Sequence, residues 1–233
     1  MTFFAVLTAL LLAMTVFAEP VKPTSFNTGP SSTRNLSTTP DRTVNALAGN
    51  VTQLTIDAIA ITEGWAGYYG NVSGHITLDN AQNETFYNWS LTTLSGEVYA
   101  TTAASPTWST IKCANDTEVA AEETALNMNA NDPDSVSNTF LNATYHPAFD
   151  TGAKQFAADT CFATNAFDAT GSQTSKFFNV ALSDGSNFIY STLMNDSVTG
   201  FDGGTWDFEL LVGEDGHGGD TSPTQYYFFV ELG

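Results

Sequence analysis

The chain has 233 residues, with 25 acidic against six basic side chains and a formal net charge of −19. So large an excess of negative charge repels phosphate backbones and anionic lipids, which argues against nucleic-acid and membrane-surface partners. The acidity suits either solubility in a salty or hot medium or the binding of divalent cations, and solubility is the simpler interpretation.

An apolar run from Phe3 to Ala18 precedes Glu19-Pro20. It has the length of a signal-peptide core and is short for a membrane span of ~20 residues. No Lys or Arg precedes the run, which departs from the usual signal-peptide pattern, and a retained pilin-like helix is the alternative. We expect residues 1–18 to be a cleaved signal peptide, so that the mature domain is secreted and not inserted in a membrane.

Residues 19–47 are rich in Pro, Ser and Thr and contain few large apolar side chains. Such a segment cannot bury enough surface to fold alone, so we predict an extended arm or tether. The composition changes at about residue 48 and shows no further break or internal repeat. We therefore expect residues 48–233 to form a single domain.

Apolar side chains alternate with polar ones in several segments of this domain, which is typical of half-buried strands. A weak alternation covers residues 54–60. Stronger ones cover residues 68–78, with Tyr68, Val72, Ile76 and Leu78 on one face, and residues 86–91, with Tyr87 and Trp89. The turn residues between the last two segments predict a hairpin.

The C-terminal third repeats this pattern at residues 178–182, 188–190, 206–212 and 226–232, and Asp184-Gly185 predicts a tight turn. One segment, residues 117–128, has helix-forming residues behind Asp116 or Thr117 as the N-cap. We therefore predict a mainly β fold, a β-sandwich of about eight to ten strands with one short helix.

Two cysteines are present, Cys113 and Cys161. In an exported chain an isolated pair favours a disulfide over a metal site or a nucleophile. A bridge between them closes a long loop, which the chain-entropy model values at roughly 4 kcal/mol.

Eight Asn-X-Ser/Thr sequons are spread along the chain, more than we assign to chance. Behind an apolar N-terminus they predict an extracellular protein that carries N-glycans. Asn71 and Asn88 fall on the polar faces of predicted strands, where a glycan is tolerated. The predicted glycosylation sites are Asn35, Asn50, Asn71, Asn83, Asn88, Asn115, Asn142 and Asn195.

No sequence motif of a known catalytic site is present, and we predict that the chain is not an enzyme. His75, His146 and His217 are each expected to be surface residues. Glu214, Asp215 and Asp220, in a glycine-rich stretch, have the oxygen ligands that Ca²⁺ prefers. A solvated loop between two strands is the simpler interpretation, and no other cofactor is expected.

Trp65, Tyr68 and Tyr69 lie close together beside glycines. Aromatic rings of this kind stack on sugars in carbohydrate-binding proteins, and they also pack in cores and interfaces. Packing is the simpler interpretation.

The runs GWAGYYGNVSGHITLDNAQNETFYNWSL, GEVYATT with WSTIKCAN, and DFELLVGEDG with YYFFVEL resemble a family of archaeal secreted, N-glycosylated, β-rich surface proteins. The resemblance extends from about residue 48 to the end and carries no catalytic residues. The predicted architecture is also similar to that of archaeal extracellular filament subunits. In those subunits a β-sandwich with a flexible N-terminal arm is completed by a strand from its neighbour.

These features predict a structural cell-surface protein that forms a homopolymer, a pilus-like extracellular filament, by strand exchange between subunits. The predicted donor is the segment 43–61, which would pair with an exposed sheet edge of the next subunit. The alternative is a carbohydrate-binding or adhesion module that uses the aromatic residues near Trp65 and a Ca²⁺ ion near Asp215.

Overall fold

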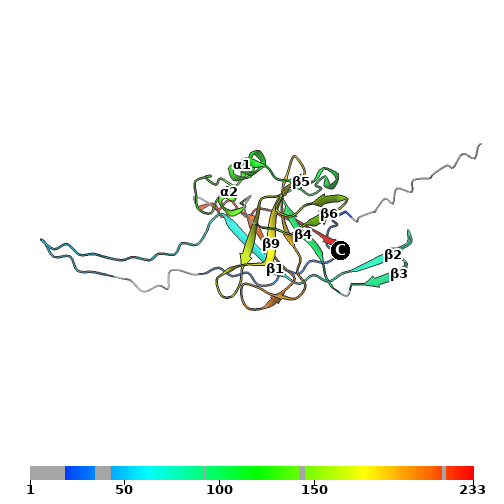
Figure 1. Ribbon diagram of the computed structural model, residues 1–233, viewed down its shortest axis with the longest axis horizontal. Helices are drawn as coiled ribbons and strands as arrows, with labels where there is room; N and C mark the ends of the chain where they lie inside the picture. Colours follow the sequence, from blue (N-terminus) through cyan, green and yellow to red (C-terminus); the bar gives the residue numbers. More distant parts are fainter. Residues whose placement is uncertain (1–18, 35–42, 92, 142–144, 217–218) are drawn as a thin grey trace, which may run out of the picture.

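The computed structural model describes residues 19–34, 43–91, 93–141, 145–216 and 219–233, so the predicted signal peptide lies outside this part of the chain. Figure 1 shows a body of packed strands from which two segments project on opposite sides. One is the segment 43–61, and the other is the hairpin of β2 (His75–Asp79) and β3 (Thr85–Ser90). Within the described residues, no helix is long and apolar enough to cross a membrane.

The largest sheet has six strands, all paired antiparallel. The long strand β9 pairs with β10 on one side and with both β5 and β8 on the other. In spatial order the strands are β14 (Tyr227–Leu232), β4 (Gly96–Thr101), β10 (Phe188–Leu193), β9 (Gln173–Ser183) and β5 (Lys112–Cys113), with β8 (Ala163–Phe167) beside β9.

This sheet has a hydrophobic core on each face, because successive side chains of a strand point to opposite sides. In β9, Ala181 belongs to the first core, with Val98 and Tyr190. Val180 belongs to the second core, with Tyr99. The central strands are therefore buried on both faces, and β10 is buried at every position.

A second layer covers the first core. β1 (Trp65–Gly70) and β13 (Phe208–Gly213) pair antiparallel, and β13 packs over β9 and β10. Leu210 and Val212 of β13 are buried in the first core. The two stacked sheets confirm the predicted β-rich, sandwich-like domain.

The free edge of β13 is closed by a buried side chain. Asn179 of β9 donates its Nδ2 proton to Glu209 O at 3.1 Å and accepts the Leu211 N–H on its Oδ1 at 2.8 Å. The amide thus replaces the backbone of a neighbouring strand, which satisfies two backbone groups that would otherwise be buried without partners.

The predicted helix is present as α1 (Asp116–Ala125), with Asn115 rather than Asp116 or Thr117 as its N-cap. It ends three residues earlier than predicted because Asn127 adopts a left-handed conformation, with a φ of 51°. A second short helix, α2 (Val136–Thr139), was not predicted. Both helices contribute to the first core.

A small hairpin covers the second core. β6 (Phe149–Thr151) pairs with β7 (Lys154–Phe156), and the rings of Phe149 and Phe156 stack with centroids 4.7 Å apart. The 3₁₀ helix η2 (Trp108–Thr110) lies on the same face, where Trp108 packs against Tyr99.

The predicted strand 206–212 is split at Asp207, whose carboxylate accepts hydrogen bonds from Val72 N and Ser197 N. Its first part is β12 (Thr205–Trp206), which pairs with β11 (Val198–Thr199). Short pairs of this kind bring the described chain to fourteen strands, more than predicted. The turn at Asp184-Gly185 is confirmed, with Gly185 at a φ of 94°.

Candidate assembly surfaces

The N-terminal arm begins by docking on the outer edge of β14. Val21 N–H donates to Val230 O at 2.9 Å, and Val230 N–H donates back to Val21 O at 2.8 Å. Phe26 packs against Phe228, with ring centroids 5.2 Å apart. Lys22 places its Nζ 5.7 Å from the centre of the Tyr227 ring, within the range of a cation–π interaction.

This docking is limited to one rung of the ladder. In an antiparallel pair that contains Val21 and Val230, the next hydrogen-bonded position would join Pro23 to Phe228. Pro23 has no N–H to donate, so the pairing cannot continue in that direction. The composition of residues 19–47 predicts an extended arm or tether and gives no indication of the strand pairing at Val21.

From residue 43 onward, the chain projects far from the body (Figure 1). Residues 43–60 are all exposed and belong to no strand or helix. The strand predicted at residues 54–60 is therefore wrong for the single chain, because these residues form no backbone pairing with any other described segment. The projection ends where Thr62 Oγ1 donates to Asp134 Oδ2 at 2.5 Å. Its exposed large apolar side chains are Val44, Leu47, Val51, Leu54, Ile56 and Ile59.

The β2–β3 hairpin projects on the other side of the body (Figure 1). Its register places Ile76 opposite Trp89 and Leu78 opposite Tyr87, so these four side chains share one face, as the alternation predicts. The predicted burial of that face is wrong, because Ile76 is 44% and Trp89 47% exposed. An isolated two-stranded hairpin is marginally stable in water, so an apolar face without a partner is unexpected in a monomer.

The sequons lie mainly on exposed positions. Asn88 pairs with Thr77 on the polar face of the hairpin, and Asn83 occupies its turn at a φ of 61°. Asn195 differs, because it is half-buried and its Nδ2 donates to Lys176 O at 3.1 Å. Asn35 and Asn142 lie outside the described residues, and the exposed sequons are Asn50, Asn71, Asn83, Asn88 and Asn115. Glycosylation itself stays a prediction.

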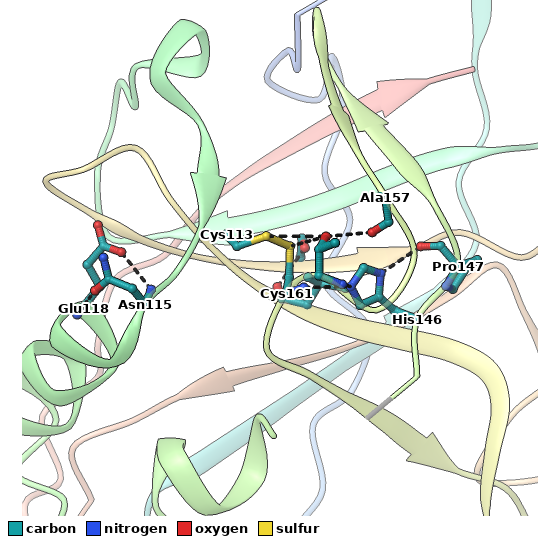
Figure 2. Close-up of a disulfide and its surroundings, with 10 residues drawn as sticks. Cys113, Asn115, Glu118, His146, Pro147, Ala157 and Cys161 are labelled. Atoms are coloured by element: carbon teal, nitrogen blue, oxygen red, sulfur yellow. Dashed lines mark hydrogen bonds between the residues drawn. A yellow bond between two sulfur atoms is a disulfide. The ribbon is translucent and has the colours of Figure 1, made fainter. Parts of the chain in front are cut away.

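The predicted disulfide between Cys113 and Cys161 is confirmed, with Cα atoms 5.0 Å apart. Figure 2 shows His146 beside it. His146 is fully buried, and its Nε2 accepts the N–H groups of Thr160 and Cys161, each at 3.0 Å. Its Nδ1 therefore carries the proton and donates to Pro147 O at 2.8 Å. The expectation that His146 is a surface residue is wrong. Its burial depends on hydrogen bonds to Thr160 and Cys161, and no local pattern near His146 indicates that these residues lie beside it.

Figure 2 also shows the N-terminus of α1. Asn115 Oδ1 accepts from Thr117 N at 3.0 Å and from Glu118 N at 3.1 Å, while Glu118 Oε2 accepts from Asn115 N at 2.9 Å. This is a capping box, which satisfies free N–H groups of the first turn. The cap uses only the oxygen of the Asn115 amide and leaves Nδ2, the atom that carries a glycan, free of the helix.

The proposed calcium ligands are not gathered around one point. Glu214 Oε1 accepts from Thr224 Oγ1 at 3.4 Å, and Asp220 Oδ1 accepts from Ser222 N at 2.8 Å. Asp215 is half-buried, and its Oδ1 has no hydrogen-bond partner in the described structure. Over the described ranges, which omit His217, no three His, Cys, Asp or Glu side chains form a group that could hold a metal ion. Calcium binding stays a prediction.

The predicted aromatic platform is not formed by its three members together. Trp65 is half-buried and packs against Phe140, with its Nε1 donating to Asp134 O at 2.5 Å. Tyr68 and Tyr69 are successive residues of β1, so their side chains point to opposite faces. A different aromatic cluster reaches the surface instead. The ring of the exposed Tyr69 packs edge to face on exposed Phe201 and on half-buried Trp206, with centroids 4.9 Å apart in each pair.

Two buried carboxylates form a feature that sequence reasoning missed. Glu97 of β4 and Glu231 of β14 are directly opposite, and the Tyr99 hydroxyl lies 3.4 Å from Glu97 and 3.2 Å from Glu231. Burial, and secondarily the charge of Glu231, raises the pKa of Glu97 to about 9. Burial also raises the pKa of Glu231, against the opposing effect of Gly152 N–H. The register of β4 and β14 is a long-range pairing, so no local signal marks this pair.

Comparisons of the chain with protein-family models, with curated proteins and with solved structures find no match. The resemblance to archaeal surface proteins therefore stays a prediction.

Proposed function

We propose that this chain is a structural, N-glycosylated subunit of an extracellular pilus-like filament, which assembles by strand exchange between subunits and has no enzymatic role. The observation that carries the proposal is the pair of apolar projections on opposite sides of the body, residues 43–61 and the β2–β3 hairpin. Subunits that join through surfaces on opposite sides form an open chain, because the contact repeats without closing.

The exposure of these projections favours assembly over a monomeric role. A soluble monomer rarely keeps a contiguous apolar surface exposed, and such surfaces mark interaction sites. In the hairpin, Ile76, Leu78, Tyr87 and Trp89 provide one apolar face. Its other face and its turn carry Asn88 and Asn83. Glycans at these positions would point away from the apolar face and leave it free for a neighbouring subunit.

The chemistry of the chain supports an extracellular address. The disulfide between Cys113 and Cys161 is stable in an oxidising compartment. Five of the predicted glycosylation sites are exposed in the described structure, as attachment requires. Together with the predicted signal peptide, these features support secretion to the cell surface.

Native material examined by electron cryo-microscopy tests the proposal. We expect ordered filaments with glycan density on the hairpin. A variant that lacks residues 19–61 is expected to form no filaments. It should still fold, which near-ultraviolet circular dichroism checks. As a control, Asp57→Asn changes one exposed charge of the projection and should assemble normally. Discrete monomers in native preparations would contradict the proposal.

Carbohydrate binding is the second candidate function, and the cluster of exposed Tyr69 and Phe201 with half-buried Trp206 favours it. Aromatic rings of this kind provide apolar faces for sugar rings. In this case the protein binds glycans on an array as a monomer, and Phe201→Ala abolishes that binding. Binding that is lost on adding a chelator would point to the predicted Ca²⁺ near Asp215.

A further inference from the structure

The only strand pairing between the N-terminal arm and the domain, within the described residues, is the Val21–Val230 rung on the outer edge of β14. We propose that in the filament this contact is exchanged: residues 19–26 of each subunit dock on β14 of the next subunit. The chain that follows them, up to Thr62, is the connection between neighbours. This inference rests on the proposed function and identifies its donor and its acceptor.

The contacts of the docked arm are suited to exchange. They include two backbone hydrogen bonds at Val21, the packing of Phe26 on Phe228 and the placement of Lys22 over Tyr227, and Pro20 is buried in the docked arm. A neighbour's arm makes the same contacts with the same edge, so replacing one by the other changes the local free energy little. Because Pro23 stops the ladder after one rung, only two backbone hydrogen bonds join the arm to β14 in the described residues.

The connecting chain is long enough to reach a neighbour. At ~3.3 Å per residue, even half of full extension carries the chain from Phe26 to Thr62 over about 60 Å. A domain of this size is about 40 Å across. The connection therefore spans an adjacent subunit without strain. In its described part, residues 27–34 and 43–60 are all exposed in the single chain.

The direction of the projecting segment 43–61 also agrees with a head-to-tail arrangement of subunits. In Figure 1 the C-terminal end of β14, marked C, lies on the side of the body opposite to the projecting segment 43–61. A subunit placed at the end of the projection in the same orientation has the C-terminal end of its β14 on the side of the incoming arm. Repetition of this step gives a head-to-tail contact that does not close, which produces a filament.

The proposed donor differs from the segment 43–61 that the sequence predicts. The segment 43–61 forms no rung with any strand, whereas Val21 already pairs with one. The alternation of apolar residues at 54–60 is therefore assigned to the connection, where its side chains can pack on the surfaces of two neighbours. The exchanged strand is the short one near Val21.

A paired cysteine variant distinguishes exchange from docking within one subunit. Hydrogen-bonded residues of an antiparallel pair have Cα atoms about 5.5 Å apart, which suits a disulfide. Filaments of Val21→Cys/Val230→Cys are oxidised, denatured and run on a gel without reductant. The native cysteines are already paired with each other, so they do not compete. We expect a ladder of covalent multimers, and each single variant should give at most a dimer.

The outcomes separate this inference from the proposed function. Filaments that dissociate entirely into internally cross-linked monomers, or that form no new disulfide, would overturn the exchange and leave the filament proposal standing. Absence of filaments from the wild-type protein would overturn both.

A second pair of variants guards against an effect of the cysteines themselves. Val21→Pro removes the N–H group that donates to Val230 O, and the loss of this hydrogen bond weakens each subunit contact by about 1 kcal/mol. We expect about a fivefold to tenfold weaker tendency to polymerise. Val21→Thr keeps the donor and should remain within about twofold of the wild type. Because Val21 is 59% exposed, both variants should retain the thermal stability of the domain. Equal polymerisation of the two variants would contradict the exchange.

Discussion

Glu97 and Glu231 face each other across β4 and β14, and both carboxyl groups are buried. The Tyr99 hydroxyl lies within reach of both, and Thr151 Oγ1 accepts its proton at 3.1 Å. No cationic side chain is within 4.0 Å of either carboxylate in the described residues. Two negative charges cannot share this site at low cost, so Glu97 keeps its proton at neutral pH.

Stability should therefore fall as the pH rises. Glu97 has an ordinary pKa of 4.5 and a folded pKa of about 9, so the folded state retains a proton that the unfolded chain has released. Its contribution is complete below pH 4.5 and is lost, by up to about 1.4 kcal/mol per pH unit, until the pH passes 9. Glu97→Gln removes this dependence and should be more stable than the wild type at about pH 8. Urea unfolding at several pH values measures it.

A surface acid provides the control for this experiment. Asp57→Asn, on the exposed projection, should leave the pH dependence of unfolding unchanged. If Glu97→Gln and Asp57→Asn show the same pH profile as the wild type, Glu97 is ionised in the folded protein and the expected proton is absent.

His146 should stabilise the folded structure around the disulfide. His146→Phe fills a similar volume but leaves the N–H groups of Thr160 and Cys161 without an acceptor, which costs about 1–3 kcal/mol for each. We expect a loss of about 2–6 kcal/mol in the free energy of unfolding. His75→Phe, at an exposed position of β2, serves as the control and should change stability little. A stability of His146→Phe close to that of the wild type would mean that water replaces the ring nitrogen.

Asn115 should act both as a helix cap and as a sequon, and two variants separate these roles. Asn115→Ala removes the cap and should destabilise the unglycosylated protein by about 0.5–2 kcal/mol. Thr117→Ala destroys the same sequon but keeps the Asn115 oxygen in the capping box. Thermal unfolding of protein made without glycans should therefore distinguish the two. Equal stability of the two variants would contradict the capping role.

Glycan occupancy should follow exposure. We expect mass spectrometry of native glycopeptides to find sugar on Asn71, Asn83 and Asn88, and little or none on Asn195. The Nδ2 of Asn195 donates to Lys176 O in the folded domain, where a glycan has less room than on the open hairpin. High occupancy at Asn195 would show that the sugar is attached before this part of the chain folds.

Much of the secondary structure could be predicted because its causes are local. The alternation at Tyr87 and Trp89 fixes which side chains of the hairpin share a face, whether or not that face is covered. The turn at Asp184-Gly185 follows from residues that favour it. The same alternation does not say what lies beneath a face, so the hairpin was predicted as part of the core.

The predicted helix shows that residue composition locates the middle of an element better than its ends. The residues from 117 onward favour helix, but the N-cap is set by which side chain can reach the N–H groups of Thr117 and Glu118. Asn115 reaches these N–H groups because it follows the end of β5 by two residues. The composition of the helix alone does not indicate this position.

By itself, the sequence determined the mainly β class, the cysteine pair, the distribution of sequons and the change in composition near residue 48, because each depends on residue types and short spacings. Only the tertiary structure decided that His146 is buried, that Glu97 faces Glu231 and that Val21 pairs with Val230. These are contacts between segments far apart in the chain. They depend on strand register and on how the sheets stack, and neither is encoded in a local pattern of residues.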